Sequence, residues 1–152
     1  MSVYAFDPGP HTGIFWQDNG GRFHSQTLDF TKPSHTASHQ RLFMWLAEAI
    51  DPGDIIICES FHFQKDKRDK EFLNYDAGEY VGVIKLFAQL NSIYYVMQQP
   101  AVKGQFWTDD KLRRVELYGV ADTKHARDAC RHFLQYDTFT NHNEDWLHRL
   151  KG

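Results

Sequence analysis

Short apolar runs near the amino terminus predict a strand hairpin. The runs at 2–7 and 12–18 are each long enough for one strand. Asn19-Gly20-Gly21 then reverses the chain into a third strand near 22–29, because Asn-Gly between apolar runs is a strong hairpin signal. The first three strands are therefore expected to pair in chain order.

The rest of the chain alternates between helical and strand patterns. The isoleucine-rich run at 54–58 predicts a strand buried on both faces, and the run at 93–97 predicts a fifth strand. Apolar positions at helical spacing predict helices at 36–50, 76–90, 109–118 and 123–136. A hairpin followed by crossover helices gives a mixed sheet covered by helices, which is an α/β fold.

Length and composition fit a single domain. The chain has 152 residues, of which 41% are apolar and 15% aromatic, so we expect one core over about 2–136. The remainder, 137–152, is expected to be a polar tail anchored by Trp146-Leu147. No apolar run is long enough to span a membrane and the start lacks a signal-peptide pattern, so we expect a soluble cytoplasmic protein. Cys58 and Cys130 are expected to be free buried thiols, because no zinc-site spacing is present.

The net charge of −3 weighs against nucleic-acid binding, but the basic residues are segregated. They gather in three groups: Lys65, Lys67, Arg68 and Lys70; Lys103, Lys111, Arg113 and Arg114; Lys124, Arg127 and Arg131. The stretch 61–74 interleaves the first group with Phe61 and Phe63. It is either a solvated charged surface or a nucleic-acid contact in which rings stack on bases while charges follow phosphates.

Two carboxylates stand at the ends of predicted strands. Asp7 enters the tight turn Pro8-Gly9, where the backbone can approach a phosphate closely. Glu59 follows the strand at 54–58. If these two strands are parallel neighbours, their carboxylates lie side by side at one edge of the sheet. An Asp-Pro-Gly turn alone is also a common structural feature, so Asp7 needs support from other residues.

The helix at 123–136 carries further candidate groups. At about 100° per residue, His125, Asp128 and His132 lie along one border of its apolar stripe. The opposite side, which is expected to face water, carries Lys124, Arg127 and Arg131. A lone histidine here would more often be a helix-surface residue. Only its combination with the strand-end carboxylates points to function.

Three carboxylates held close together repel one another and raise one another's pKa. A divalent cation relieves this repulsion, and an oxygen-rich ligand set favours Mg²⁺ or Mn²⁺. We expect two ions per site, with Asp7 bridging, Glu59 and Asp128 flanking, and His125 as a ligand or proton-transfer group. Such a pair of ions activates water and stabilises the leaving oxygen of a phosphodiester. The pattern therefore predicts phosphodiester hydrolysis.

These motifs resemble the RuvC family of Holliday junction resolvases, which belongs to the ribonuclease H-like (retroviral integrase) superfamily. The matching features, over about 2–136, are Asp7-Pro8-Gly9 with Thr12-Gly13, the apolar run ending in Glu59, Gly82, Pro100-Ala101-Val102-Lys103 and His125-Ala126-Arg127-Asp128-Ala129. The resemblance implies a five-stranded mixed sheet flanked by helices on both faces. The chain departs from the family between Pro100 and Lys124, where the family's glycine-rich segment is missing, and in the longer charged loop after Glu59.

The resemblance also implies an activity: a homodimeric, divalent-metal-dependent endonuclease that nicks opposing strands of a four-way DNA junction in recombination and repair. It implies that the catalytic residues are Asp7, Glu59, His125 and Asp128, with Lys103 near the scissile phosphate. The implied DNA contacts are Phe61 or Phe63, stacking on junction bases, and Lys111 as a second lysine. A compact relative of this kind indicates a bacteriophage origin and action in the host cytoplasm. The helix at 76–90 is apolar on more than one side, so its second apolar side either meets a partner subunit, which favours a dimer, or is buried beneath neighbouring loops.

Three other functions stay open at this point. The same site would serve a nuclease that cuts flaps, replication forks or other branched DNA. Hairpins of the Asp-x-Gly-x-x-Thr type also bind nucleotide phosphates in the actin-like ATPase and sugar-kinase superfamily, although those proteins use two such domains. The third possibility is a binding module without activity, against which the intact set of candidate ligands argues.

Overall fold

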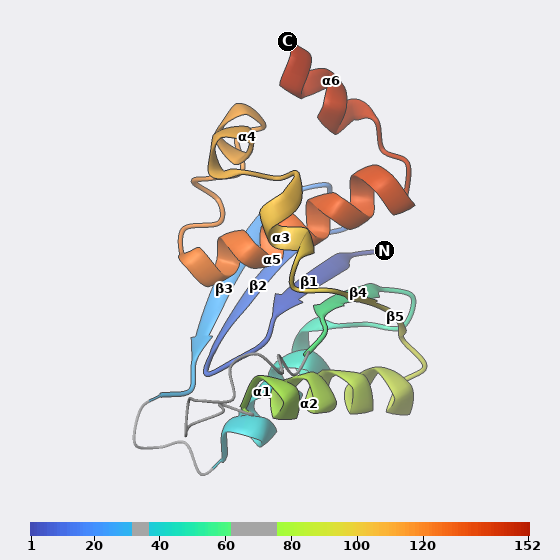
Figure 1. Ribbon diagram of the computed structural model, residues 1–152. Helices are drawn as coiled ribbons and strands as arrows, with labels where there is room; N and C mark the ends of the chain where they lie inside the picture. Colours follow the sequence, from blue (N-terminus) through green and yellow to red (C-terminus); the bar gives the residue numbers. More distant parts are fainter. Residues whose placement is uncertain (32–36, 62–75) are drawn as a thin grey trace.

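The computed structural model describes residues 1–31, 37–61 and 76–152, without the side chains at positions 76, 103 and 104. Five strands form one mixed sheet in the order β3-β2-β1-β4-β5 (Figure 1). The strands are β1 (Val3–Asp7), β2 (His11–Gln17), β3 (Phe23–Asp29), β4 (Ile55–Glu59) and β5 (Tyr94–Gln98). Every strand expected from the sequence is therefore present, with bounds shifted by one residue at most.

The strands that end in Asp7 and Glu59 are parallel neighbours, as the predicted site requires. β1 pairs antiparallel with β2 after the Pro8-Gly9 turn, and β2 pairs antiparallel with β3, as the Asn-Gly turn predicts. β4 runs parallel to both β1 and β5. The register sets Phe6 beside Cys58, so Asp7 and Glu59 follow at the same level on neighbouring strands.

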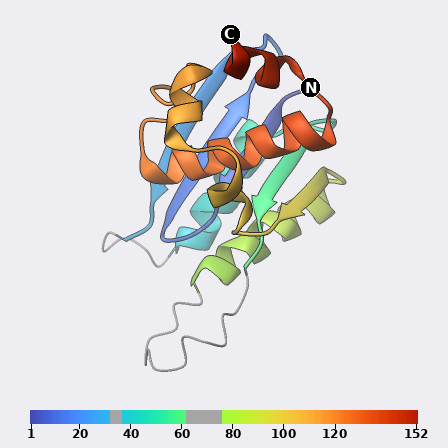
Figure 2. The same cartoon turned by 45° about the horizontal axis from the view of Figure 1, so that its top comes forward.

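Helices cover both faces of the sheet. α1 (Ser38–Ala49) and α2 (Asp76–Leu90) lie on one face (Figure 1). α5 (Lys124–Gln135) crosses the strands on the other face, as Figure 2 shows. That side also carries α3 (Val102–Gln105), α4 (Asp109–Arg114) and α6 (Asp145–Lys151). Within the described ranges, no helix combines the length and the apolar character needed to cross a bilayer.

Strand alternation decides which side each residue faces. Phe6 and Cys58 belong to the apolar cluster beneath α1 and α2, whereas Ala5 and Ile57 belong to the cluster beneath α5. Because side chains alternate along a strand, the next residue of each strand, Asp7 or Glu59, falls on the α5 side. The two cysteines are free and buried, Cys58 in the first cluster and Cys130 in the second, as predicted.

The segment after 136 differs from the predicted polar tail. α5 continues into a π-helical segment, η3 (Tyr136–Thr140), and the chain ends in α6. The buried carboxylate of Asp137 accepts hydrogen bonds from the Asn141 and Asn143 side-chain amides, both at 2.8 Å, and from Trp146 Nε1 at 2.7 Å. Trp146 is buried, which confirms the expected anchor. The buried Asp137 side chain therefore stabilises the polar carboxyl-terminal segment through hydrogen bonds.

The region between Pro100 and Lys124 also differs from expectation. The short helix α3 has no signal in the hydrophobic pattern. α4 ends at Arg114, earlier than the helix predicted at 109–118, and Glu116 has a positive φ of 63°. An α-helix does not accommodate that conformation, so the chain leaves the helix and turns back toward α5.

Candidate active site

The turn after β1 holds Asp7 in place. The Thr12 hydroxyl donates to the Gly9 carbonyl at 2.7 Å and accepts from the Gly9 amide at 3.2 Å. The Phe30 amide donates to the Pro10 carbonyl at 2.7 Å, which attaches the turn to the end of β3. Thr12 is fully buried and Asp7 is 7% exposed. The Asp-Pro-Gly turn therefore presents the carboxylate from a rigid backbone.

Gly13 brings α5 to the same place. It pairs with Asp7 across β1 and β2. A side chain at Gly13 would overlap the main-chain carbonyl of His125 and lie 2.8 Å from the Ala126 nitrogen. The helix begins there because the Thr123 hydroxyl caps it, accepting from the Ala126 amide at 3.1 Å. The start of α5 consequently lies directly over the end of β1.

Four predicted site residues line one cavity of about 310 Å³. Asp7 and Glu59 come from the strand ends, and His125 and Asp128 come from the first turns of α5. The remaining lining residues are Pro8, Gly9, Pro10, His11, Ala77 and Lys124. Residues more than a hundred positions apart in the chain therefore meet at one sheet edge, as the sequence predicts.

Helix α5 provides a basic partner for each of the three carboxylates. His125 Nδ1 lies 3.3 Å from Asp7 Oδ2. Arg131 Nη1 donates to Asp128 Oδ1 at 2.6 Å, and His132 Nε2 lies 2.8 Å from Glu59 Oε2. These contacts offset the repulsion that the sequence predicts among the acidic groups. Across the described ranges, no three His, Cys, Asp or Glu side chains are gathered closely enough to hold a metal ion.

Arg131 corrects one expectation from the helical wheel. It was expected to face water, yet its side chain is only 13% exposed. Its Nε donates to the Trp107 carbonyl at 2.8 Å, and its Nη2 pairs with Asp109 at the start of α4. A helical wheel could not predict the burial of Arg131, because the residues that cover it, Trp107 and Asp109, lie outside α5. The segment that contains them shows no periodic hydrophobic pattern.

One lining residue of the cavity, His11, was not singled out by the sequence analysis, and Lys124 was singled out only as part of a basic group on the water-facing side of the helix. His11 stacks on His125, with ring centroids 5.4 Å apart and planes 17° apart, and its Nδ1 lies 3.6 Å from Asp29 Oδ1. Lys124 lines the cavity beside them and is exposed, as expected for its side of the helix. His11 directly follows the turn that presents Asp7, so its sequence position was the one available clue.

The predicted DNA contacts after β4 are described only in part. Phe61 is 39% exposed and lies near Gly78, where an added Cβ would be 3.3 Å from the ring. It lines a smaller cavity of about 80 Å³ that shares Pro8, Glu59 and Ala77 with the main one. The other predicted contacts of this loop lie outside the described residues: Phe63, Lys65, Lys67, Arg68 and Lys70. Lys103 belongs to α3, and its side chain is likewise outside the description.

The basic residues of α4 pack against the protein. Lys111 Nζ lies 3.4 Å from the centre of the Phe106 ring, and the Arg113 guanidinium lies 4.1 Å from that of Tyr118. Arg114 donates to the carbonyl of Leu150 in α6 at 3.5 Å. None of the three lines the 310 Å³ cavity. Their role as DNA contacts stays a prediction.

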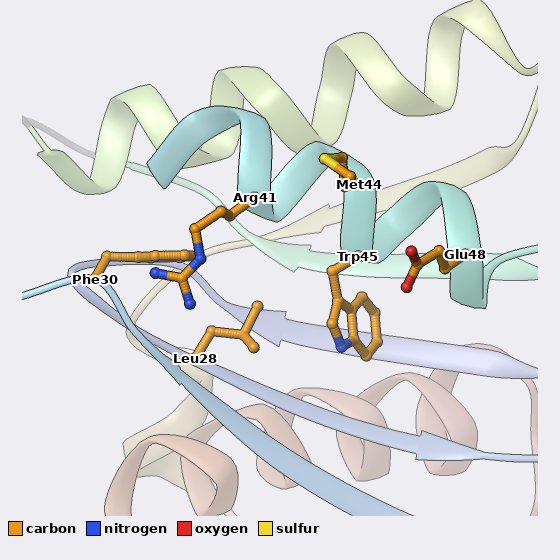
Figure 3. Close-up of a pocket in the computed structure, with 6 residues that line it drawn as sticks. All are labelled: Leu28, Phe30, Arg41, Met44, Trp45 and Glu48. Atoms are coloured by element: carbon orange, nitrogen blue, oxygen red, sulfur yellow. The ribbon is translucent and has the colours of Figure 1, made fainter. Parts of the chain in front are cut away.

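A separate hollow of about 230 Å³ lies on the opposite face of the sheet. Figure 3 shows it between β3 and α1, with Arg41 reaching toward Phe30 and Trp45 directed toward Leu28. Met44 and Glu48 complete its lining. Its lining includes one carboxylate and one guanidinium, and neither Asp7 nor Glu59, which face α5, is part of it. The carboxylate cavity is therefore the candidate active site.

Comparison with known proteins identifies the fold. No protein-family model and no curated protein matches the sequence. The structure is similar to Thermus thermophilus RuvC in complex with a Holliday junction substrate, with TM-score 0.67 and 20% identity, over 94% of this chain and 96% of that one. A second T. thermophilus RuvC structure gives 0.61 and 17%, over 93% and 96%. The yeast mitochondrial Holliday junction resolvase Ydc2 gives 0.54 and 13%, over 98% and 80%. The chain thus has the ribonuclease H-like α/β fold of RuvC, which confirms the predicted fold class.

Proposed function

We propose that this protein is a divalent-metal-dependent endonuclease that resolves four-way DNA junctions by paired phosphodiester hydrolysis. The observation that carries the proposal is the common cavity of Asp7, Glu59, His125 and Asp128. The sequence selects these four residues independently of any coordinates. The fold shared with RuvC and with a yeast Holliday junction resolvase adds support for the substrate.

The donor chemistry of the cavity fits Mg²⁺ or Mn²⁺. Three carboxylates and one imidazole form an oxygen-rich set of the kind that hard divalent cations prefer. A carboxylate has several acceptor directions on two oxygens, so a hydrogen bond from α5 and a metal bond are compatible on one group. Asp7, Glu59, Asp128 and His125 are the residues that would hold the ions, after side-chain movement that draws them together, because no three of the described side chains are close enough to hold an ion as they stand.

The roles of the protein groups follow from their positions. Two bound divalent ions supply the Lewis acidity that activates water and stabilises the leaving oxygen. Asp7, on the rigid turn, would hold the ions together with Glu59 and Asp128. The His125 ring, with Nδ1 3.3 Å from Asp7 Oδ2, is suited to bind a metal or to move a proton. Lys124 lines the same cavity and is suited to pair with a phosphate oxygen.

DNA contacts are proposed at three sets of residues. Phe61 is partly exposed beside it and is suited to stack on an unpaired base at the junction. The basic groups at 65–70, with Lys103, would follow the phosphates. Lys111, Arg113 and Arg114 of α4 form a further basic set on the α5 side of the sheet.

Paired nicking requires two active sites, and α2 supports a homodimer. Its buried side packs on the sheet, whereas Leu86 and Leu90 are 51% and 66% exposed, and Gly82 has open space around it. These three positions recur at helical spacing and form an outward apolar stripe. Light scattering at micromolar concentration should give twice the monomer mass of 17.8 kDa. A monomer would remove this part of the proposal.

The decisive test is cleavage of synthetic DNA by the wild-type protein and by Asp7→Asn. We expect wild-type protein to cut a four-way junction with Mg²⁺ or Mn²⁺ and to stop when a chelator is added. Asp7→Asn, which keeps the size but removes the charge, should bind the junction and fail to cut it. Asp51→Asn, an exposed carboxylate in the turn before β4, is the matched control and should cut normally.

The outcomes separate the alternatives. Cutting by Asp7→Asn at the wild-type rate would overturn the site assignment. A panel with flaps, forks and linear duplexes tests the substrate. Equal or faster cutting of flaps or forks would favour a general branched-DNA nuclease with the same site.

A further inference from the structure

His132 is a fully buried titratable side chain in contact with a residue of the cavity, and the roles proposed above do not use it. Its side chain has 0% exposure. Nε2 lies 2.8 Å from Glu59 Oε2, and Nδ1 lies 2.7 Å from Gln98 Oε1. A buried imidazole with a polar partner at each nitrogen cannot rotate without breaking a hydrogen bond.

The contact joins three elements at one point. Glu59 and Gln98 are register partners at the ends of the parallel strands β4 and β5. His132 enters from α5, four residues after Asp128 and seven after His125, so it shares their side of the helix. The imidazole therefore fixes the end of β4 relative to the helix that carries the other site residues.

The chemistry of the His132–Glu59 contact shows which group donates the hydrogen bond and which group is held by it. A carboxylate can only accept hydrogen bonds, so Nε2 is the ring nitrogen that donates to Glu59. A glutamate side chain has several rotatable bonds and loses much of its freedom when it is held in one orientation. A partner that is itself locked by Gln98 supplies that orientation before any ligand binds.

We propose that His132 is the positioning residue for Glu59: it holds the carboxylate in the orientation that faces the cavity and a divalent ion. This inference rests on the proposed function, because it requires Glu59 to be a metal ligand. It assigns no contact between His132 and the DNA or the reacting phosphate. Its effect passes through Glu59 alone.

Two substitutions of His132 distinguish its role in orienting Glu59 from its role in filling space in the core. His132→Gln retains an amide donor close to the position of Nε2, whereas His132→Asn retains only a group close to Nδ1 and loses the contact with Glu59. The matched control is His24→Asn. His24 pairs with Asp18 at the same 2.8 Å distance, at the turn end of the β2–β3 hairpin and outside the cavity lining.

Mn²⁺ binding to the protein without DNA, measured by calorimetry, is the first readout, and junction cleavage against Mn²⁺ concentration is the second. We expect His132→Asn to bind Mn²⁺ about 10–100-fold more weakly and to shift the cleavage curve to higher Mn²⁺ by a similar factor. His132→Gln should recover most of the affinity, and His24→Asn should match wild type. If His132→Asn does not fold, Gln98→Ala, which leaves the imidazole unlocked, should show a smaller shift in the same direction.

The contrary results are distinct. Wild-type affinity in His132→Asn, or in Gln98→Ala where that variant replaces it, would overturn the positioning role and leave the proposed function intact. Equal losses in His132→Gln and His132→Asn would also overturn it, because the retained donor would then be irrelevant. A wild-type protein that binds no Mn²⁺ would overturn both the proposed function and this inference.

Discussion

Gly13 lies against the main-chain carbonyl of His125, with no room for a side chain between them. Gly13 is also the register partner of Asp7 across the hairpin. One residue without a side chain therefore sets the distance between the strand that carries Asp7 and the helix that carries His125 and Asp128. The Thr12-Gly13 motif therefore requires glycine at position 13 because α5 packs directly against its backbone.

Replacing Gly13 by alanine should damage both stability and the site. The methyl group would overlap the backbone of α5, and overpacking of this kind costs about 1–3 kcal/mol. We expect a loss of that size or larger in urea unfolding, together with a severe loss of junction cleavage because α5 moves away from Asp7. Gly119→Ala is the control, since its Cβ would meet no atom within 4 Å. Normal cleavage by a folded Gly13→Ala variant would contradict this explanation.

Arg131 should be worth more to stability than an ordinary surface arginine. It links Asp128 with Asp109 and the Trp107 carbonyl, and its removal leaves a mostly buried carboxylate without that cation. Breaking such a pair costs about 3 kcal/mol or more. Urea unfolding of Arg131→Ala measures this cost, and Arg131→Lys should recover only part of it because an ammonium cannot reach all three acceptors.

The control for Arg131 is an exposed pair on α4. Arg113 Nη1 lies 3.8 Å from Asp110 Oδ1, with side chains 54% and 83% exposed. Removing an exposed ion pair costs less than about 1 kcal/mol, and losing the contact of Arg113 with the Tyr118 ring adds about 0.5–1 kcal/mol, so the total stays below the loss expected for Arg131. Similar losses in Arg113→Ala and Arg131→Ala would show that the buried contacts add nothing.

Asp137 should hold the carboxyl-terminal segment in place. Its removal would leave the buried Trp146 Nε1 without its 2.7 Å acceptor and would break two hydrogen bonds from asparagine side chains. We expect Asp137→Ala to lose about 3 kcal/mol in urea unfolding, since each abandoned buried group costs about 1–3 kcal/mol. Glu144→Ala, an exposed carboxylate in the same segment with no capping hydrogen bond, should change little. Equal stability of the two variants would refute the role of Asp137.

The two cysteines should resist modification while the protein is folded. Burial raises the pKa of the Cys58 thiol far above its ordinary value, and the charges of Glu59 and Asp7 raise it further. Burial also raises the pKa of Cys130. Because the thiolate is the reactive form, raising the pH to about 8.5 should not expose either group to a disulfide reagent. Both should react after unfolding in guanidinium chloride. Rapid labelling of the native protein would show that the core opens at one of these sites.

The sequence by itself determined the strands, most of the helices and the four residues of the candidate site. Strand alternation and the helical period are local properties, and they place Asp7 and Glu59 at strand ends and His125 and Asp128 on one helix face. The sequence analysis required β1 and β4 to be parallel neighbours if Asp7 and Glu59 were to lie side by side, and the two strands pair in this way. Sequence reasoning succeeded where a residue's position depends on the period of its own element.

The tertiary structure alone decided how those groups are held. Arg131 was expected in water and is covered by Trp107 and Asp109. His132 meets Glu59 and Gln98, and the expected polar tail folds around Asp137. In each case the partners come from segments without periodicity, brought together by the packing of the whole chain. A hydrogen bond between such segments depends on the path of the backbone between them, and no local pattern records that path.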